Sequence, residues 1–179
     1  CAQWRGEDPE KAAVLYVYGH VRVYHGHQTA LPRHYVARQK LCLRATTDYW
    51  VNAMDGQPFF LFNQAVDPGM LQVLEHQLVP RLEKEIPNQP TPEQLAADAK
   101  LHRFALVFDR EGYSPGFLRA MKAKRIACLT YHKYPGEDWR PEEFFPCSVP
   151  LSSGACVEML LAERGTFLGG KLWVREIRK

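Results

Sequence analysis

The stretch FALVFDREGYSPGFLRAMKAKRIACLTY, residues 104–131, decides the fold class of this chain. It opens with five apolar residues at 104–108, a run typical of a strand buried on both faces of a parallel sheet. Ser114 and Pro115 then match a helix start, with a capping hydroxyl followed by proline at the first helical position. Residues 126–131 predict a second buried strand. A strand, a helix and a strand at this spacing predict a βαβ unit with two parallel strands.

Three further strands are predicted upstream of this unit. Residues 14–24 alternate with a period of two, which indicates a strand with one buried face. Residues 35–44 predict a second strand and residues 58–66 a third, with the turn signal Asp55-Gly56 just before the third. Because the loops between them are short, these strands favour an antiparallel meander.

Helices are predicted between the two groups of strands. Asp67 and Pro68 resemble a helix start, and leucines at helical spacing continue the pattern to residue 86, with a kink expected at Pro80. Thr91 begins a capping box for a second, short helix that ends near residue 101.

This order of elements predicts an α/β fold with a ribonuclease-H-like mixed sheet. Three antiparallel strands are followed by a parallel βαβ unit, and helices are expected on the faces of the sheet. Residues 134–150 are rich in proline and acid and predict a loop. Residues 156–162 and 172–177 predict a hairpin, and the whole chain, residues 1–179, is interpreted as a single domain.

The charge of the chain is unevenly distributed. The net charge is only +3, but residues 12–47 contain no Asp or Glu. A local field of one sign attracts a phosphate backbone, although a solvated basic strand face explains the pattern equally well. The candidate DNA-binding residues of this segment are Arg22, Arg33, Arg38, Lys40 and Arg44.

The remaining composition narrows the class of protein. Five cysteines, an odd number, show no zinc or redox spacing, and three lie in apolar runs. They indicate small buried side chains in a reducing, cytoplasmic environment more than a disulfide framework. No run approaches the roughly 18 apolar residues that a membrane helix needs, so no membrane partner is expected.

Asp109 is the sharpest candidate for chemistry. It directly follows the buried strand 104–108, and sites in open α/β sheets form beyond the carboxyl ends of the strands. The alternative is a loop acid that caps the following turn or pairs with Arg110. His25 and His27 could share one face of a strand, but no further ligand follows at metal-binding spacing. The segment GTFLGGK at residues 165–171 lacks the Ser or Thr and the helix of a phosphate loop, so this interpretation is rejected.

Several segments together resemble bacterial insertion-sequence transposases of the DDE class. The resemblance extends from about residue 14 to the end of the chain, and the most specific segment is FDREGYS. The matching segments are GHVRVYHG (19–26), TDYWVN (47–52), GQP (56–58), FDREGYS (108–114) and TYHK (130–133).

The resemblance implies a catalytic site of two Asp and one Glu in a ribonuclease-H-like core. Such residues hold two divalent metals that act on a DNA phosphodiester. Asp109 matches the second Asp, and Tyr18 occupies the place of the first, directly before Gly19. The Glu is expected beyond Lys179, because Glu176 lies in a strand-like alternation.

A tyrosine at position 18, in place of the first Asp, affects metal binding. A phenol cannot replace a carboxylate as a ligand of a hard cation at neutral pH. The resemblance therefore implies Mg²⁺ or Mn²⁺ in the intact enzyme but no tightly bound metal here. It also implies an inactive core, truncated before its C-terminal helix, with DNA as partner and a homo-oligomer in a transposition complex. Two alternatives stay open: a non-catalytic nucleic-acid-binding remnant, or a magnesium-dependent phosphohydrolase that uses Asp109.

Overall fold

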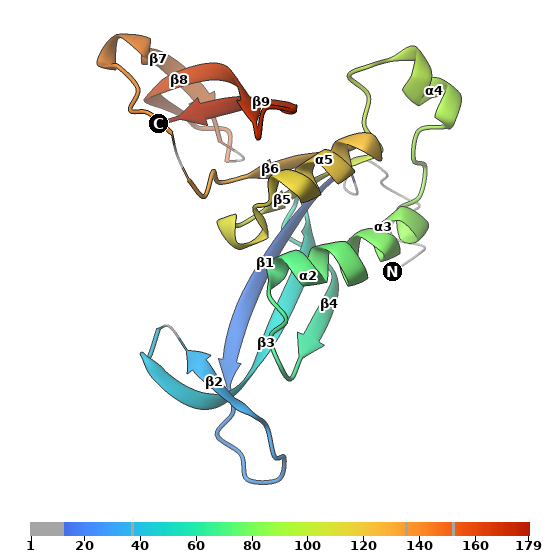
Figure 1. Cartoon of the computed structure of the whole chain (residues 1–179), viewed down its shortest axis with the longest axis vertical. Coiled ribbons are helices and arrows are strands. Elements are labelled where there is room, and N and C mark those ends of the chain that lie inside the picture. Colours follow the sequence, from blue (N-terminus) through green and yellow to red (C-terminus); the bar gives the residue numbers. More distant parts are fainter. Residues whose placement is uncertain (1–12, 37, 135, 152) are drawn as a thin grey trace. The chain divides into compact units, whose positions relative to one another are not determined.

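The computed structural model describes residues 13–179 apart from residues 37, 135 and 152 (Figure 1). The chain divides into two compact units, one up to Lys133 and the other comprising Tyr134–Lys179. The first is a mixed α/β unit, and the second consists of strands and one short 3₁₀ turn.

The first unit is built on a six-stranded mixed sheet. Its central strands pair in the order β4, β3, β1, β5, β6. The pairs β1–β3 and β3–β4 are antiparallel, whereas β5 runs parallel to both β1 and β6. These pairings confirm the predicted parallel unit beside a group of antiparallel strands. The strands are β1 (Val14–Val23), β2 (Arg33–Val36), β3 (Leu41–Ala53), β4 (Pro58–Gln64), β5 (Phe104–Phe108) and β6 (Ile126–Thr130).

The second predicted strand, residues 35–44, is wrong in its bounds. The chain turns after β2, and Lys40 at the end of this turn has a positive φ of 53°. The central strand is β3, which pairs first with β2 and then with β1. Aromatic and β-branched residues at 46–51 favour this extended conformation, and Asp48 lies within the strand. Asp55 does lie in the turn, where its carboxylate accepts a hydrogen bond from the Gln57 amide at 3.1 Å.

A helical segment follows the antiparallel strands. It comprises α2 (Met70–Val73), a π-helical turn (Leu74–Leu78) and α3 (Val79–Glu85). Pro80 has no amide hydrogen to donate, and the wider π-helical turn directly before it accommodates this defect. The helix begins two residues later than predicted, with Gly69 and not Asp67 at the cap position.

Two shorter helices match their sequence signals. The capping box predicted at Thr91 is formed with Gln94 and begins α4 (Pro92–Ala97), which ends four residues before the predicted residue 101. Ser114 Oγ accepts a hydrogen bond from the Phe117 amide at the start of α5 (Pro115–Ala123).

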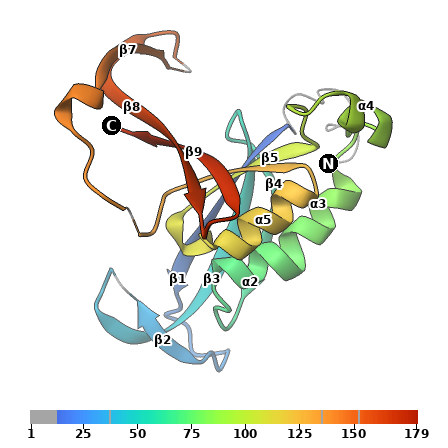
Figure 2. The ribbon, with the colours of Figure 1, turned by 45° about the horizontal axis from the view of Figure 1, so that its top comes forward.

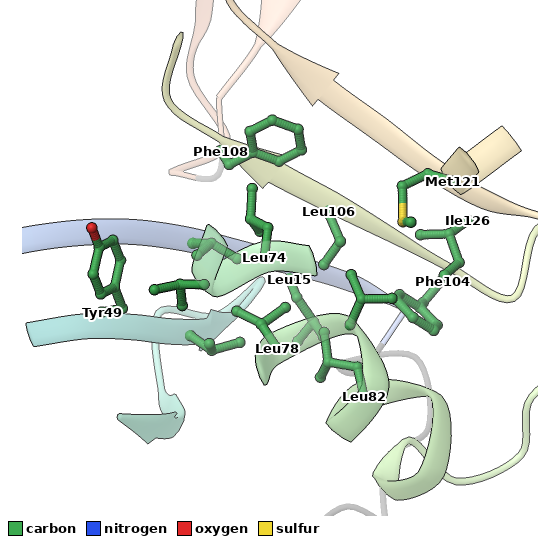
Figure 3. Close-up of a cluster of buried hydrophobic side chains, with 14 of the residues drawn as sticks. Leu15, Tyr49, Leu74, Leu78, Leu82, Phe104, Leu106, Phe108, Met121 and Ile126 are labelled. Carbon is green, nitrogen blue, oxygen red and sulfur yellow. The ribbon is translucent and has the colours of Figure 1, made fainter. Parts of the chain in front are cut away.

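The hydrophobic core lies between the sheet and the helices α2, α3 and α5 (Figure 3). Leu15, Leu78 and Leu106 are fully buried in it. Side chains of α5 belong to the same cluster as those of α2 and α3, and Figure 2 shows the three helices on one side of the sheet. The expectation of helices on both faces is therefore wrong for the described residues. The opposite face carries half-exposed side chains such as Tyr16 and Tyr18.

The second unit is a three-stranded antiparallel sheet, β7–β8–β9. Its strands are β7 (Phe145–Pro150), β8 (Cys156–Leu168) and β9 (Leu172–Arg178). Residues 145–150 are thus a strand and not a loop, and β8 runs six residues beyond the predicted 162. Gly169 and Gly170, with φ of 55° and 67°, make the turn to β9, as positive φ at adjacent positions allows in tight hairpins.

Candidate functional site

Tyr18 and Asp109 each directly follow one member of a residue pair that joins β1 and β5. Val17 pairs with Phe108 where β1 runs parallel to β5. Both of these side chains point into the core, with exposed fractions of 2% and 4%. Because side chains alternate along a strand, the residues that follow them are expected on the opposite face, the one without helices. Tyr18 is 44% exposed and Asp109 is exposed, in agreement with this placement.

Asp109 also organises the end of its strand. Its Oδ1 accepts a hydrogen bond from the Arg110 amide at 2.6 Å, which caps a 3₁₀ turn over residues 110–112. The Asp109 carbonyl accepts hydrogen bonds from the Gly112 amide at 3.0 Å and from Thr130 Oγ1 at 3.2 Å. Asp109 therefore makes the hydrogen bond of a capping residue. Capping does not change its location directly after β5, where a functional carboxylate is expected.

A second carboxylate on β3 was not identified from the sequence. Asp48 is 1% exposed and lies between its strand partners His20 and Asn63. Its Oδ1 accepts a hydrogen bond from Asn63 Nδ2 at 2.5 Å, and its Oδ2 lies 2.5 Å from a guanidinium nitrogen of Arg22. The high strand propensity of the residues around it was the available signal. Arg22, one of the candidate DNA-binding residues, therefore forms an ion pair with Asp48 inside the protein.

The described residues do not fit a two-metal centre. No group of three or more His, Cys, Asp or Glu among them is arranged to hold a metal ion. The pair Tyr18 and Asp109 offers one carboxylate, and a phenol does not replace the other. No catalytic step through a metal follows from this arrangement.

The four other candidate DNA-binding residues lie on one projecting ribbon. Arg33 on β2 is the direct strand partner of Arg44 on β3, and Arg38 and Lys40 lie in the turn that joins the two strands. All four are exposed, and none takes part in the ion pairs found among the described residues. The structure therefore brings these cations together and separates Arg22 from them.

A buried hydrogen bond fixes β3 behind the candidate site. Tyr49 Oη donates to Asp67 Oδ1 at 2.5 Å, and Thr47 Oγ1 donates to the other carboxylate oxygen at 3.2 Å. Burial, with the nearby Asp67 carboxylate, raises the pKa of Tyr49 far above its usual range. The Tyr49 ring lies beside Gly19, where a Cβ atom would stand 3.1 Å from Tyr49 Cε1.

The second unit holds a separate polar cluster. Glu143 accepts hydrogen bonds from Arg164, which also lies over the Trp139 ring with its guanidinium carbon 4.4 Å from the ring centroid. Hydrogen bonding to Arg164 lowers the pKa of Glu143 to about 2. These contacts connect the 3₁₀ turn at 141–143 to β8. The charges of Glu143 and Arg164 are thus paired with each other and have a structural role.

A mixed sheet with an aspartate at the end of a parallel strand and a projecting basic ribbon is an arrangement suited to a protein that acts on nucleic acid. The chain belongs to a transposase family: a family model described as "Transposase protein" matches residues 1–179. Membership of this family implies DNA transposition, with DNA as the partner. No curated protein and no solved structure matches the chain significantly. Within the described residues, no helix has the length and apolar character to cross a membrane.

Proposed function

We propose that this chain provides the ribonuclease-H-like core of a DDE-class transposase and binds DNA through its phosphate backbone. The proposal depends on the register of β1 and β5. Val17 pairs with Phe108, so the residues that follow them, Tyr18 and Asp109, are expected to lie near each other. The resemblance assigns these two positions to the catalytic aspartates.

The order of the sheet supports the fold part of the proposal. Strands β1, β3 and β4 are consecutive antiparallel neighbours, apart from the small hairpin strand β2, and β5 and β6 continue in parallel on the other side of β1. This mixture of antiparallel and parallel strands supports the ribonuclease-H-like part of the proposal. In the proposal, residues 134–179 belong to the same functional core.

The proposal assigns no phosphodiester cleavage to the chain as it stands. Tyr18 supplies a phenol where a metal-binding carboxylate is expected, and the described residues hold no other metal cluster. For this chain, the proposal is therefore a transposase core that binds DNA without cleaving it.

A binding and nicking assay on labelled duplex DNA tests this function. We expect affinity that falls steeply with salt and depends little on sequence, because the contacts are made to phosphates. We expect no nicked product with Mg²⁺ or Mn²⁺. Binding that is insensitive to salt, or absent at low salt, would refute the DNA-binding part, and nicking would refute the assignment of Tyr18.

A further inference from the structure

We infer that the ribbon formed by β2, the turn after it and the first residues of β3 inserts into the major groove of duplex DNA. We call residues 33–44 the basic ribbon. The inference rests on the proposed function, since it specifies how the chain would hold DNA.

The basic ribbon stands apart from the body of the unit. No residue between Tyr18 and Asp48 belongs to the main core cluster, and Figure 1 shows β2 and the adjoining part of β3 far from the helices. The ribbon is held by pairing between β2 and β3 over four residue pairs, from Arg33 with Arg44 to Val36 with Leu41. A two-stranded element of this kind has the dimensions that the major groove admits.

The charges of the basic ribbon point to an anionic occupant. Arg33 and Arg44 are direct cross-strand partners, and like charges in this relation destabilise a strand pair. Arg38 and Lys40 add two exposed cations at the turn. The nearest acid along the strand, Asp48, is buried and engaged by Arg22. DNA phosphates on the two sides of a groove would neutralise the charges of Arg33 and Arg44 and so remove the repulsion between them.

One side of the basic ribbon presents side chains suited to a groove. Tyr35 pairs with Cys42 two residues along from the arginine pair, so alternation places these four residues on the same side. Tyr35 is 62% exposed, and Cys42 is an exposed free thiol. The prediction of buried cysteines is therefore wrong for Cys42, and also for Cys156, which is exposed as well. Cys42 therefore reports directly on whether DNA covers this side.

The first test is the alkylation rate of Cys42 in the unmodified chain, measured by mass spectrometry with and without a duplex of two helical turns (about 20 base pairs). We expect saturating duplex to slow alkylation of Cys42 at least about tenfold, as burial of an accessible thiol requires. Cys156, an exposed thiol of the second unit, is the internal reference. Dimethyl sulfate should at the same time show protection of guanine N7, which faces the major groove.

The second test removes the paired charges. The double variant Arg33→Gln, Arg44→Gln should bind the duplex about tenfold or more weakly at low salt. Its slope of log affinity against log salt should be shallower by about 1.8, the value for two lost phosphate contacts. The matched control is Arg119→Gln, Lys122→Gln, which removes two exposed cations from α5. This control should change the affinity by less than about twofold and leave the salt slope unchanged.

The outcomes separate this inference from the proposed function. If the duplex binds but Cys42 stays reactive, or guanine N7 is unprotected, the groove insertion is wrong while DNA binding stands. If both double variants weaken binding equally, the cations act only by net charge and the inference also fails. If no duplex binds at low salt, the proposed function itself is wrong. The alkylation test uses no variant, so a folding defect cannot obscure it.

Discussion

At the scale of single residues, the face of the sheet without helices concentrates the chemistry that the sequence contains. Asp109 and Tyr18 follow a register pair, and Asp48 lies two positions along β3 from Trp50, the partner of Tyr18. Asp109 was predicted because an apolar run that ends in Asp is visible without coordinates, and Tyr18 was named because the resemblance places it where the first Asp is expected. Asp48 was missed because its burial depends on β1 and β4, which contribute Arg22 and Asn63 from distant parts of the chain.

Gly19 offers a residue-scale test of the packing behind the site. A Cβ atom at this position would stand 3.1 Å from Tyr49 Cε1. The Tyr49 ring cannot move away easily, because its hydroxyl is hydrogen-bonded to Asp67. We expect Gly19→Ala to lower the free energy of unfolding by about 1–3 kcal/mol, the usual cost of overpacking. Urea denaturation measures this.

Gly136→Ala is the matched control for this substitution. A Cβ atom at Gly136 would meet nothing within 4 Å, and its φ is not in the left-handed region. It should leave the free energy of unfolding unchanged within about 0.5 kcal/mol. Equal effects of the two variants would show that Tyr49 does not restrict position 19.

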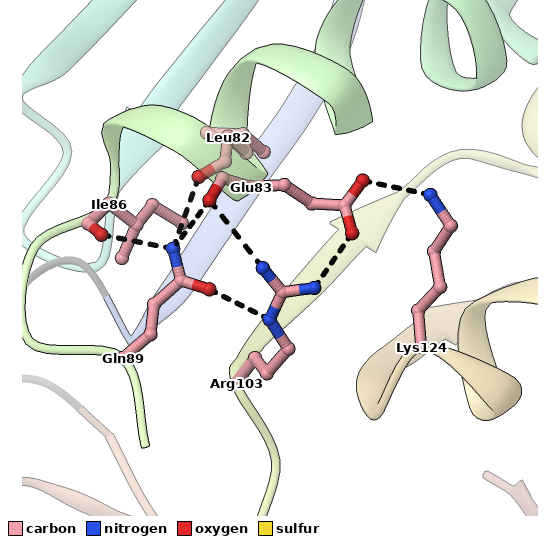
Figure 4. Close-up of polar contacts among 6 residues, drawn as sticks. All are labelled: Leu82, Glu83, Ile86, Gln89, Arg103 and Lys124. Atoms are coloured by element: carbon pink, nitrogen blue, oxygen red, sulfur yellow. Dashed lines mark hydrogen bonds and ion pairs between the residues drawn. The ribbon is translucent and has the colours of Figure 1, made fainter. Parts of the chain in front are cut away.

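At the scale of elements, one acidic side chain connects α3 to the strands and to α5 (Figure 4). Glu83 accepts hydrogen bonds from Arg103, just before β5, at 2.7 Å and from Lys124, at the end of α5, at 2.8 Å. Gln89 accepts from Arg103 and donates to the carbonyl of Ile86 at 3.0 Å, which satisfies the end of α3. The network therefore fixes the helices to the parallel part of the sheet.

The pH dependence of stability tests this network. Burial raises the pKa of Glu83, but the hydrogen bonds from Lys124 and Arg103 outweigh it, so the pKa lies below its usual value. A lowered folded pKa means that the contribution is complete above the unfolded pKa of about 4.3 and is lost as the pH falls through the folded value. Glu83→Gln should lower the free energy of unfolding by about 1–2 kcal/mol at pH 7. This difference from the unmodified chain should shrink below about pH 4.

Glu85→Gln is the control for the network, measured by thermal unfolding across the same pH range. Glu85 pairs with Arg81 one turn away on the same helix, a contact worth about 0.5 kcal/mol or less. If both variants lose the same stability with the same pH profile, the contacts between elements contribute nothing specific.

The helical segment also carries the core. Leu78, in the π-helical turn, is fully buried against the sheet. We expect Leu78→Ala to cost about 2–5 kcal/mol, through lost burial and the cavity left behind. Leu71, which is only partly buried on α2, should cost clearly less when changed to Ala. Chemical denaturation of both variants compares the two positions, and equal losses would contradict the placement of this helix face.

At the level of the whole molecule, the sequence predicted the parallel βαβ unit and a group of antiparallel strands before it. Local signals sufficed there: a continuous apolar run, a capped helix and a second run. It did not predict the turn inside residues 35–44 or the strand at 145–150, because these depend on partners elsewhere in the chain. Lys40 adopts a positive φ in this turn, and the sequence there contains no glycine or asparagine that would have predicted a turn. Pro146 and Pro150 lie in β7, whose one partner among the described strands is β8, and prolines are tolerated in such an edge strand.

We propose that Tyr18 and Asp109 lie together at the position of a metal-binding pair. A Mn²⁺ titration of the unmodified chain, Tyr18→Asp and the control Tyr35→Asp, followed by the electron paramagnetic resonance signal of free Mn²⁺, tests it most directly. We predict a weak Mn²⁺ site only in Tyr18→Asp, because only there do two carboxylates follow a paired Val17 and Phe108 on neighbouring strands and so lie close enough to share a cation. Tyr35→Asp adds the same charge at an exposed strand position of the basic ribbon. If Tyr18→Asp binds Mn²⁺ no more tightly than Tyr35→Asp does, residue 18 and Asp109 do not form the proposed site.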